Sequence, residues 1–453
     1  MDLCCAAREC VSFSYNAPWT LNVSYMGCPA APKDAGQRSP CCCLKDKAPP
    51  LEPNKWDMNI TTGVVPPRPP PPCNNSMDCN LNGECVAGKC ACDPQWADAD
   101  CGRLNLVPAP SLDGAYQHKV NLSDCATSCG PSSWGGIPLK SAADGKYHLF
   151  ASQFVNNCTL KGWNRGSTVI RATASTPMGP YEYAETVLPT FHHNPTVRRL
   201  SPEQSGTGKE LFVLYMIGAD APPPAGKGAQ CVSSDWDNHH LEGYISMAWS
   251  ESLEGPWNVS KHALLPSGAP SGWDAMVTNP APLFLADGTA YLYFRGTQWP
   301  VSGFERIGVA KAASWRGPYG RVSASDAPLW GPFDDQRKFV EDPWVWQSPR
   351  GFHMLAHGHF DENGYYACAE HPEGPWQFRV APTYTNVVAM ADGSTRTLVQ
   401  RERPQLWFDE DTGAPGILFT GVAPPGAAFY GYTYTFAQRI NQQAKEDKEK
   451  YGM

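Results

Sequence analysis

A short turn recurs four times in this chain, and it constrains the fold more than any other feature of the sequence. The copies are TPMGPY (176–181), SLEGPW (252–257), SWRGPY (314–319) and HPEGPW (371–376). The residue seven positions before the turn glycine is alanine in every copy: Ala172, Ala248, Ala310 and Ala367. Glycine permits a positive φ and proline ends hydrogen-bond pairing, so each copy is typical of a strand followed by a tight turn. We therefore interpret the repeat as structural.

Strands that open with a proline accompany these turns. They begin at GIPLK (136–140), NPTV (194–197), NPAPLF (279–284), DPWVW (342–346) and RPQLW (403–407). Short runs such as ELFVLYMIG (210–218) and AYLYFRG (290–296) are apolar on both faces, as expected of strands inside packed sheets. Units of several strands that repeat about every 60 residues predict a β-propeller, and five openings predict five blades. The fifth unit lacks the turn, and we expect FYGYTYTF (429–436) to supply its last strand.

Cysteines and glycosylation sequons indicate the compartment. The chain has 18 cysteines, most of them before residue 130, which is typical of an oxidising environment. N-x-S/T sequons occur at Asn22, Asn59, Asn74, Asn121, Asn157 and Asn258. No apolar run reaches the ~18–20 residues of a membrane span. We expect an extracellular or lumenal glycoprotein. The opening MDLCCAAREC does not resemble a signal peptide, so we also expect the true start to be missing.

Two segments at the ends of the chain fall outside the repeat. Residues 1–72 hold seven cysteines, an odd number, and end in the linker PPRPPPP (66–72), which predicts a stiff polyproline II spacer. Residues 441–453 form a charged tail. The formal net charge is −8 and there is no Lys/Arg-rich block, which argues against a nucleic-acid partner.

Six cysteines between residues 73 and 101 have the spacing C-x5-C-x5-C-x4-C-x-C-x8-C. This spacing resembles an EGF-like module, here residues 73–102, and the resemblance implies three disulfides: Cys73–Cys85, Cys79–Cys90 and Cys92–Cys101. About 30 residues cannot bury a stabilising core, so disulfides must stabilise the module. The acidic and amide cluster of calcium-binding modules is missing, so we expect no calcium. We expect the module to act as a spacer or a protein contact.

Residues 130–440 resemble the five-bladed propeller superfamily of family 43 glycoside hydrolases, arabinanases, invertases and levansucrases. The turns of the form S-x-x-G-P-[YW] and the strand starts HNP, NP, EDP and RERP carry this resemblance. It implies a mainly β fold, with catalytic carboxylates at the mouth of a central funnel. Asp would precede the proline in blades 1 and 2, and Glu would lie two residues before it in blade 3. The residues there are Ile137, Asn194 and Thr278, so the usual carboxylates are not in place.

Acidic residues at other strand starts are the alternative candidates. The candidate catalytic residues are Glu341, Asp342, Glu402 and Asp274, of which Glu341 is the first choice for acid/base work. The candidate substrate-binding residues are His193, Asn194, Asn279, Trp273, Trp344, Arg403 and His357. A structural role is equally consistent with the sequence: Glu402 would then pair with Arg401 or Arg403, and Asp342 would bond to a backbone turn.

Three histidines share one strand face in HMLAHGH: His353, His357 and His359. His353 and His357 would lie about 13 Å apart, too far to bind one metal ion. We therefore expect no cofactor and no catalytic metal. The resemblance implies a structural ion near the propeller axis, beside His357 or His359.

Two functions remain open from the sequence. The first is a secreted glycoside hydrolase or related carbohydrate-active enzyme that takes a glycan substrate. The second is a catalytically degenerate extracellular protein that binds a glycan or a protein. The pairing of Cys125, Cys129, Cys158, Cys231 and Cys368 is also open, although Cys125 and Cys129 are close enough in sequence to form one bridge.

Overall fold

The computed structural model describes residues 72–120, 130–218, 231, 245–260, 262–269, 272–297, 305–322, 328–329, 340–359 and 361–442. The predictions made for residues 1–71, for Cys125 and Cys129, and for the tail beyond residue 442 lie outside them. Residues 70–453 form one compact unit.

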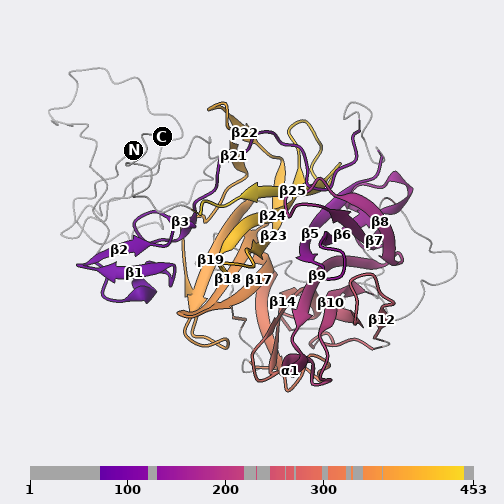
Figure 1. Cartoon of the computed structure of the whole chain (residues 1–453), viewed down its shortest axis with the longest axis horizontal. Coiled ribbons are helices and arrows are strands. Elements are labelled where there is room, and N and C mark those ends of the chain that lie inside the picture. The colour runs from indigo at the N-terminus through magenta and orange to yellow at the C-terminus, as the bar shows by residue number, and fades with distance from the viewer. Residues whose placement is uncertain are drawn as a thin grey trace, which may run out of the picture. The chain divides into compact units, whose positions relative to one another are not determined.

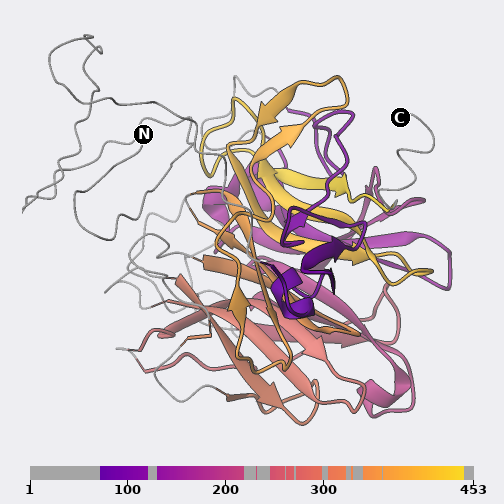
Figure 2. The same ribbon diagram turned by 90° about the vertical axis from the view of Figure 1, so that its left-hand side faces the viewer.

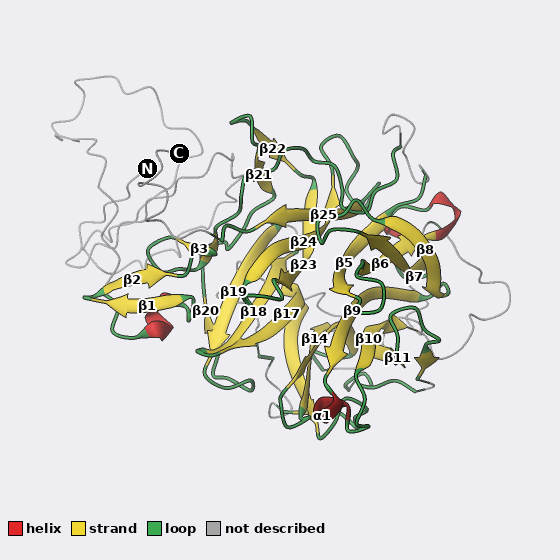
Figure 3. Cartoon of the chain, viewed as in Figure 1, coloured by secondary structure: helices red, strands yellow, loops and turns green. Residues whose placement is uncertain are grey.

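Five antiparallel sheets make up most of this unit (Figures 1 and 3). Blade 1 contains β5 (Ser133–Lys140), β6 (Tyr147–Phe154), β7 (Ser167–Ala174) and β8 (Glu182–Leu188). Blade 2 contains β9 (His192–Leu200), β10 (Leu211–Gly218), β11 (Ile245–Ser250) and β12 (Asn258–Val259). Blade 3 contains β13 (Met276–Phe284), β14 (Ala290–Thr297), β15 (Glu305–Ala312) and β16 (Gly320–Arg321). Blade 4 contains β17 (Val340–Ser348), β18 (Gly351–Gly358), β19 (Asn363–Ala369) and β20 (Gln377–Phe378). Blade 5 contains β23 (Gln400–Phe408), β24 (Pro415–Ala423) and β25 (Tyr434–Arg439).

The first strands of the five sheets form a closed ring. In the order β5, β9, β13, β17 and β23, each first strand contacts the next, and β23 contacts β5. In Figure 1, β5, β9, β17 and β23 lie around a common centre, and β8 and β12 lie further out. The predicted mainly β, five-bladed propeller is therefore confirmed. The other elements in the ring region are short: η3 (Val155–Asn157), η4 (Leu160–Gly162), α1 (Pro202–Ser205) and the hairpin β21 (Val387–Ala389) with β22 (Thr395–Thr397).

Each repeated turn connects the third and fourth strands of its own blade. Their glycines have φ values of 85°, 88°, 81° and 92°, and each is followed by a cis proline. The aromatic residue after the proline packs onto the second strand of the preceding blade, in the pairs Phe150–Trp257, Tyr215–Tyr319 and Tyr293–Trp376. The alanine seven residues before the glycine is fully buried in all four blades and pairs with Leu or Met of the second strand. The predicted common register is confirmed.

Blade 5 is completed from the N-terminal side of the propeller. FYGYTYTF was expected to supply its last strand, and β25, which begins within it at Tyr434, is the third strand. The segment that precedes β5 forms two isolated antiparallel bridges beside this strand. Tyr116 pairs with Thr435 in β25, and Leu106 pairs with Ile440 just after it. This pairing closes the ring and gives blade 5 an outer neighbour.

Each first strand contains a β-bulge with a left-handed residue. In blades 2 to 5 this residue directly precedes the proline: Asn194, Asn279, Asp342 and Arg403, with φ values of 52°, 51°, 54° and 56°. In blade 1, Gly135 and Gly136 occupy the bulge, at φ 57° and 103°. The alignment of Ile137 and Pro138 with the other strand openings is therefore wrong by two positions, because two glycines make the bulge there without a proline.

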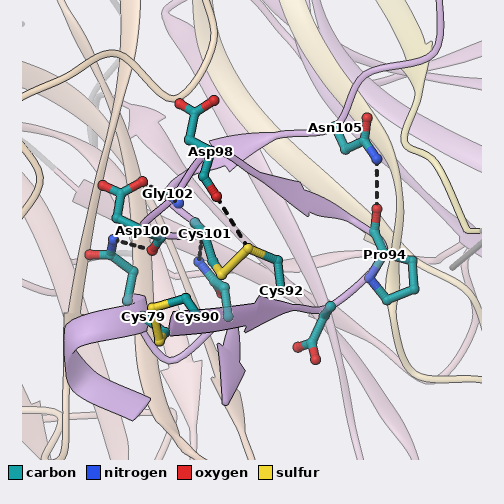
Figure 4. Close-up of a disulfide and its surroundings, with 12 residues drawn as sticks. Cys79, Cys90, Cys92, Pro94, Asp98, Asp100, Cys101, Gly102 and Asn105 are labelled. Atoms are coloured by element: carbon teal, nitrogen blue, oxygen red, sulfur yellow. Dashed lines mark hydrogen bonds between the residues drawn. A yellow bond between two sulfur atoms is a disulfide. The ribbon is translucent and has the colours of Figure 1, made fainter. Parts of the chain in front are cut away.

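The N-terminal module contains η1 (Ser76–Cys79), β1 (Gly83–Val86), β2 (Lys89–Cys92), β3 (Trp96–Ala97) and β4 (Arg103–Leu104). The three implied disulfides, Cys73–Cys85, Cys79–Cys90 and Cys92–Cys101, are all present. Figure 4 shows the last two of these with the local bonds around them, including Asn105 to the Pro94 carbonyl. The small disulfide-rich module ahead of the propeller is therefore confirmed.

One face of the module packs against blade 4, as the view from that side shows (Figure 2). Trp96 stacks on Trp346 with ring centroids 6.5 Å apart. Arg350 donates two hydrogen bonds to Asp93, at 2.6 and 3.0 Å. Arg379 pairs with Asp98 and Asp100. Because these contacts include a stacked tryptophan and three arginine–carboxylate pairs, the module is an integral part of the unit, and its role as a spacer or a protein contact stays a prediction.

The remaining described cysteines resolve the open pairing. Cys158 forms a disulfide with Cys231, and Cys368 is a buried free thiol. Burial raises the pKa of the Cys368 thiol to about 12. The sequon residues Asn74, Asn157 and Asn258 are all exposed. In the described part of the chain, no helix has the length and apolarity needed to cross a membrane.

Candidate functional site

Charged side chains gather at one end of the propeller axis, where the first strands begin. The set, called the axial cluster below, comprises Asn279, Arg295, Glu305, Glu341, Asp342, His357, His359, Glu402 and Arg403. They come from blades 3, 4 and 5, at the bulges of the first strands and at the facing ends of the strands beside them. Nearly all of them are buried.

Asp342 is held in place by neighbouring blades. Arg403 Nη1 donates to Asp342 Oδ1 at 2.8 Å, and Asn279 Nδ2 donates to the same oxygen at 2.7 Å. Burial alone would raise the pKa of Asp342, but Arg403 and His357 outweigh it and hold the pKa well below the usual range. Arg403 Nη2 also donates to the Asn194 carbonyl at 2.8 Å. Asp342 therefore acts as a fixed anion that ties blades 2 to 5 together.

Gly135 leaves the space that Arg403 needs. A Cβ atom at Gly135 would lie 2.7 Å from Arg403 Cγ. The blade 1 bulge thus provides no functional group, and the blade 5 arginine crosses over it to reach blade 2. The residue of blade 1 at the bulge is Gly135 rather than Ile137, and it too carries no carboxyl group.

His357 lies among three carboxyl groups. Its Nδ1 is 3.3 Å from Asp342 Oδ2, and its Nε2 is 3.6 Å from both Glu341 Oε1 and Glu402 Oε2. Burial would lower the pKa of His357, but Glu402, Asp342 and Glu341 raise it to about 10. The imidazole is therefore a cation at neutral pH and balances part of the negative charge.

Glu402 is the neutral acid of the cluster. Its side chain is buried and accepts a hydrogen bond from Gln400 Nε2 at 2.7 Å. Burial raises the pKa of Glu402 to about 8, with a further contribution from Glu362, while His357 works in the opposite direction. At neutral pH this carboxyl group carries a proton that it can donate.

Glu305 has the opposite character. Arg295 Nη2 lies 3.1 Å from Glu305 Oε1, and His359 Nδ1 lies 3.0 Å from Oε2. Burial would raise the pKa of Glu305, but Arg295 and His359 outweigh it and lower the pKa. Between these two acids, Glu341 accepts from Arg295 at 3.1 Å, and burial together with Glu305 raises its pKa. The same cluster therefore holds an ionised carboxylate, Glu305, and a protonated acid, Glu402.

The cluster has the atoms for a cation site. Glu341, Asp342, His357 and Glu402 each offer one ligand atom, and these atoms lie within 4.8 Å of one another. Protonated His357 has no free lone pair, and Arg403 and Asn279 already bond to Asp342. A cation would thus have to displace a proton, and the structural ion expected near the axis stays a prediction. His353 lies apart from the cluster, as the strand spacing predicts. Its ring nitrogens are hydrogen-bonded to the hydroxyl groups of Tyr366 and Ser348.

Three predicted residues lie away from the axial cluster. Asp274 pairs with Arg321 of the outermost strand of blade 3. Trp273 stacks on Phe294 and covers the backbone at Gly296 and Gly308, where a Cβ would lie 2.4 Å from its ring. Trp344 is buried past the bulge, under the guanidinium of Arg198. The structure therefore does not bring these three side chains to the first-strand end of the axis.

His193 and Asn194 lie beside the cluster in blade 2. His193 Nδ1 is 2.8 Å from Ser167 Oγ, and burial, assisted by Arg403, lowers its pKa to about 3, so the ring is neutral. Asn194 contributes its carbonyl to Arg403, while its side-chain Oδ1 is buried without a hydrogen-bond partner among the described residues. The expected pairing of Glu402 with Arg401 or Arg403 is wrong, because Arg403 pairs with Asp342 and Arg401 donates to Thr385 and Gln438.

Sequence reasoning missed Glu305, Arg295 and Tyr430. Tyr430 OH is 2.6 Å from His359 Nε2, and its neighbour Phe429 is 37% exposed. Trp163, from the loop after η4, lies against His193. The available signal for Glu305 was a lone acid at the start of the strand ERIGVAKA, and no proline follows it to mark the position as a strand opening.

Several solved structures have a similar chain fold. One is a thermostable family-43 glycoside hydrolase, at 15% identity and a TM-score of 0.44, covering 69% of this chain and 91% of that one. Another is a family 117 glycoside hydrolase from the marine bacterium Zobellia galactanivorans, at 14% identity and a TM-score of 0.46, covering 72% of this chain and 91% of that one. A third is the catalytic domain of a GH62 α-L-arabinofuranosidase from Coprinopsis cinerea, at 10% identity and a TM-score of 0.49, covering 74% of this chain and 98% of that one. No protein-family model matches the chain, and neither does any curated protein.

Proposed function

We propose that this protein is a carbohydrate-active enzyme that hydrolyses a glycosidic bond at the axial cluster. The observation that carries the proposal is the pair of buried carboxyl groups with opposite pKa shifts, raised to about 8 in Glu402 and lowered in Glu305. Two acids whose environments separate their pKa values are the usual arrangement for general acid and base roles in glycoside hydrolysis. The propeller resemblance of residues 130–440 agrees with this chemistry.

Glu402 is the proton donor in the proposed reaction. Its carboxyl proton passes to the glycosidic oxygen as the bond from that oxygen to the sugar carbon breaks. A water oxygen forms the new bond to that carbon, and the proton released from the water passes to Glu305. The products are a shortened glycan and a free sugar end, so atoms and charge balance.

Glu305 is the proposed base, because Arg295 and His359 keep its carboxylate ionised. Glu341 has a raised pKa and shares Arg295 with Glu305, so in the proposed reaction it positions its neighbours.

The aromatic residues near the cluster suit a sugar ring. The rings of Phe429 and Tyr430 contact each other edge to face, with their centroids 4.6 Å apart. Trp163 lies on the blade 1 side, beside His193. Aromatic faces provide an apolar surface for a sugar ring, and the bond from the Tyr430 hydroxyl to His359 fixes the position of the tyrosine ring. These residues are the proposed substrate contacts, together with His193 and Asn194.

The second candidate is a glycan- or protein-binding propeller without catalysis. Three observations favour it: blades 1 to 3 have Gly135, Asn194 and Thr278 at the positions where the resembling family has carboxylates, Asp342 is locked by Arg403, and the axial acids are buried. In that case the cluster is a structural plug and the aromatic rim alone binds the ligand.

A substrate screen separates the two candidates. The purified full chain is incubated with plant, fungal and animal polysaccharides and with aryl glycosides, and released sugar is measured. The matched variants are Glu305→Gln and Glu251→Gln, the latter an exposed acid that pairs with Lys209 at the surface. The enzyme proposal predicts release by the wild type and by Glu251→Gln, and a loss of roughly 100-fold or more in Glu305→Gln. Glycan-array binding with no release from any substrate would overturn it in favour of the second candidate.

We also propose that the protein resides in the extracellular space or the secretory lumen. The disulfides and the exposed sequons at Asn74, Asn157 and Asn258 support this location. Any protein partner of the module must use the face away from blade 4, where Val86 is 57% exposed. Expression in a eukaryotic host and treatment with an N-glycosidase test the location: an unchanged gel mobility would contradict it.

A further inference from the structure

The opposite end of the propeller axis contains a cavity. It is lined by the last residues of the first strands and consists of two adjoining parts, of about 350 Å³ and about 250 Å³, which share Arg198, Arg199 and Phe408. The smaller part is mostly apolar, with Ile137, Leu139 and Trp344 among its walls. The axial cluster uses the first residues of the same strands, so this cavity is separate from the proposed catalytic end.

Arg198 gives this cavity its chemical character. Its guanidinium lies over the Trp344 ring, 3.6 Å from the centroid. Nε donates to the Pro282 carbonyl at 3.2 Å and Nη2 to the Val345 carbonyl at 3.1 Å. These contacts fix the plane of the guanidinium, and Nη1 has no hydrogen-bond partner in the part of the chain that the structure describes.

The charge of Arg198 is not neutralised. None of the described carboxylates forms an ion pair with it, whereas the two other cations of the cavity are paired: Arg199 with Glu210 at 3.7 Å and Lys140 with Glu410 at 3.5 Å. Burial lowers the pKa of Arg198 to about 9. A partly buried cation normally has a counter-ion, and the free edge of this one borders an apolar cavity.

We propose that this cavity binds a small organic carboxylate with an apolar body, whose carboxylate pairs with Arg198 and whose body lies among Ile137, Leu139 and Trp344. Because Nε and Nη2 are held by the two carbonyls, Nη1 presents its N–H groups to a carboxylate from a fixed position. The volume is in the range of small-molecule sites. The proposal does not depend on the function of the axial cluster.

Calorimetric titration of the full chain with sodium benzoate tests the proposal, with benzyl alcohol as the neutral probe of similar shape and inorganic phosphate as an anion without an apolar body. Benzoate should bind at least about tenfold more tightly than either, because only it offers both features. Phosphate binding equal to benzoate binding, or no benzoate binding, would overturn the proposal.

Arg198→Met keeps a side chain over Trp344 and removes the charge, so it should weaken benzoate binding about tenfold or more and leave benzyl alcohol unchanged. The matched control is Arg316→Met, since Arg316 also lies over a tryptophan, 4.3 Å from the Trp315 centroid, but outside the cavity. If Arg198→Met does not fold, Leu139→Phe fills the cavity and should abolish binding of both aromatic probes. Unchanged benzoate affinity in a folded Arg198→Met or Leu139→Phe variant would contradict the assignment.

Discussion

The two ends of the propeller axis handle charge in opposite ways. At the first-strand starts, Asp342 and Arg403 pair across blades, and most charged groups in the axial cluster have a partner. At the strand ends, Arg198 is held by two carbonyls and a tryptophan, with no counter-ion among the described residues. The end with the axial cluster, called the paired end, therefore has its charges compensated within the protein. The end with Arg198, called the unpaired end, has a cation available for a ligand.

The bulges explain why the charges gather at one end. A left-handed residue turns its side chain out of the regular alternation of the strand. In blades 3 to 5 those residues are Asn279, Asp342 and Arg403, which bond to one another. Beyond the bulge the strands regain their pairing, and aromatic and aliphatic side chains line the axis instead.

The largest expected effect is at the paired end. Asp342→Asn leaves Arg403 buried without its anion, and Arg403→Met leaves Asp342 without its cation. Each change should lower the free energy of unfolding by about 3–5 kcal/mol, and the double variant should lose less than the sum. Urea unfolding of the four proteins measures this. A loss below about 1 kcal/mol in both single variants would show that the pair does not hold the blades together.

The next effect concerns the space beneath Arg403. Gly135→Ala places a Cβ atom on a residue at φ 57°, 2.7 Å from Arg403 Cγ. We expect a loss of about 1–3 kcal/mol in the free energy of unfolding. Gly393→Ala is the matched control, because Gly393 has φ 83° and a Cβ added there would have nothing within 4 Å. If the two variants lose equal stability, backbone conformation alone accounts for the effect and Arg403 is not crowded.

The pH dependence of stability follows from the protonated groups at the paired end. The pKa is raised to about 10 in His357 and to about 9 in His359, so each favours the folded state most below its ordinary value near 6.5. That contribution is lost as the pH rises through these raised values. We expect the free energy of unfolding to fall by several kcal/mol between pH 6.5 and pH 10, because each tenfold difference in proton affinity between the folded and unfolded states corresponds to about 1.4 kcal/mol.

Glu402→Gln provides the control for this pH profile. It removes the carboxylate that contributes most to raising the pKa of His357, so its profile should be flatter. Thermal unfolding followed across this pH range measures both proteins. A wild-type stability that stays constant or increases above pH 7 would contradict the assignment of protonated histidines.

The smallest effect should be at the unpaired end. Arg198→Met loses a cation–π contact and two hydrogen bonds, but it also removes a desolvated charge. We expect stability within about 1 kcal/mol of the wild type. Chemical denaturation beside Arg403→Met makes the comparison direct. Equal losses in the two arginine variants would break the distinction between the two ends.

The repeat revealed the fold because its four copies share one register. The Gly-Pro turns and the buried alanines recur at fixed spacing, and a propeller is the architecture in which such units form a ring. The first strands of blades 2 to 5 were also predicted, since a proline marks each opening, but the left-handed residue before each proline was not. Blade 1 was misaligned because its glycines need no proline for the same conformation.

The site was harder to predict than the fold. Glu341, Asp342, Glu402 and Asn279 were correctly expected to converge, because they lie at strand openings. Trp344 was expected beside them as a neighbour in the sequence, but it lies past the bulge, under Arg198. Asp274 pairs with Arg321, which is distant in the sequence, and Glu305 enters from a third strand. Such long-range partners leave no local pattern.

The central claim is that Glu402 donates a proton to the leaving group. It is tested most directly by comparing kcat/KM of the wild type and Glu402→Gln on two glycosides of the same sugar, one with an alkyl leaving group and one with a dinitrophenyl leaving group. The account predicts a loss of about 100- to 10,000-fold on the alkyl glycoside and a much smaller loss on the dinitrophenyl glycoside, whose leaving group needs no proton. Equal losses on both substrates, or full activity of the variant on both, would contradict it.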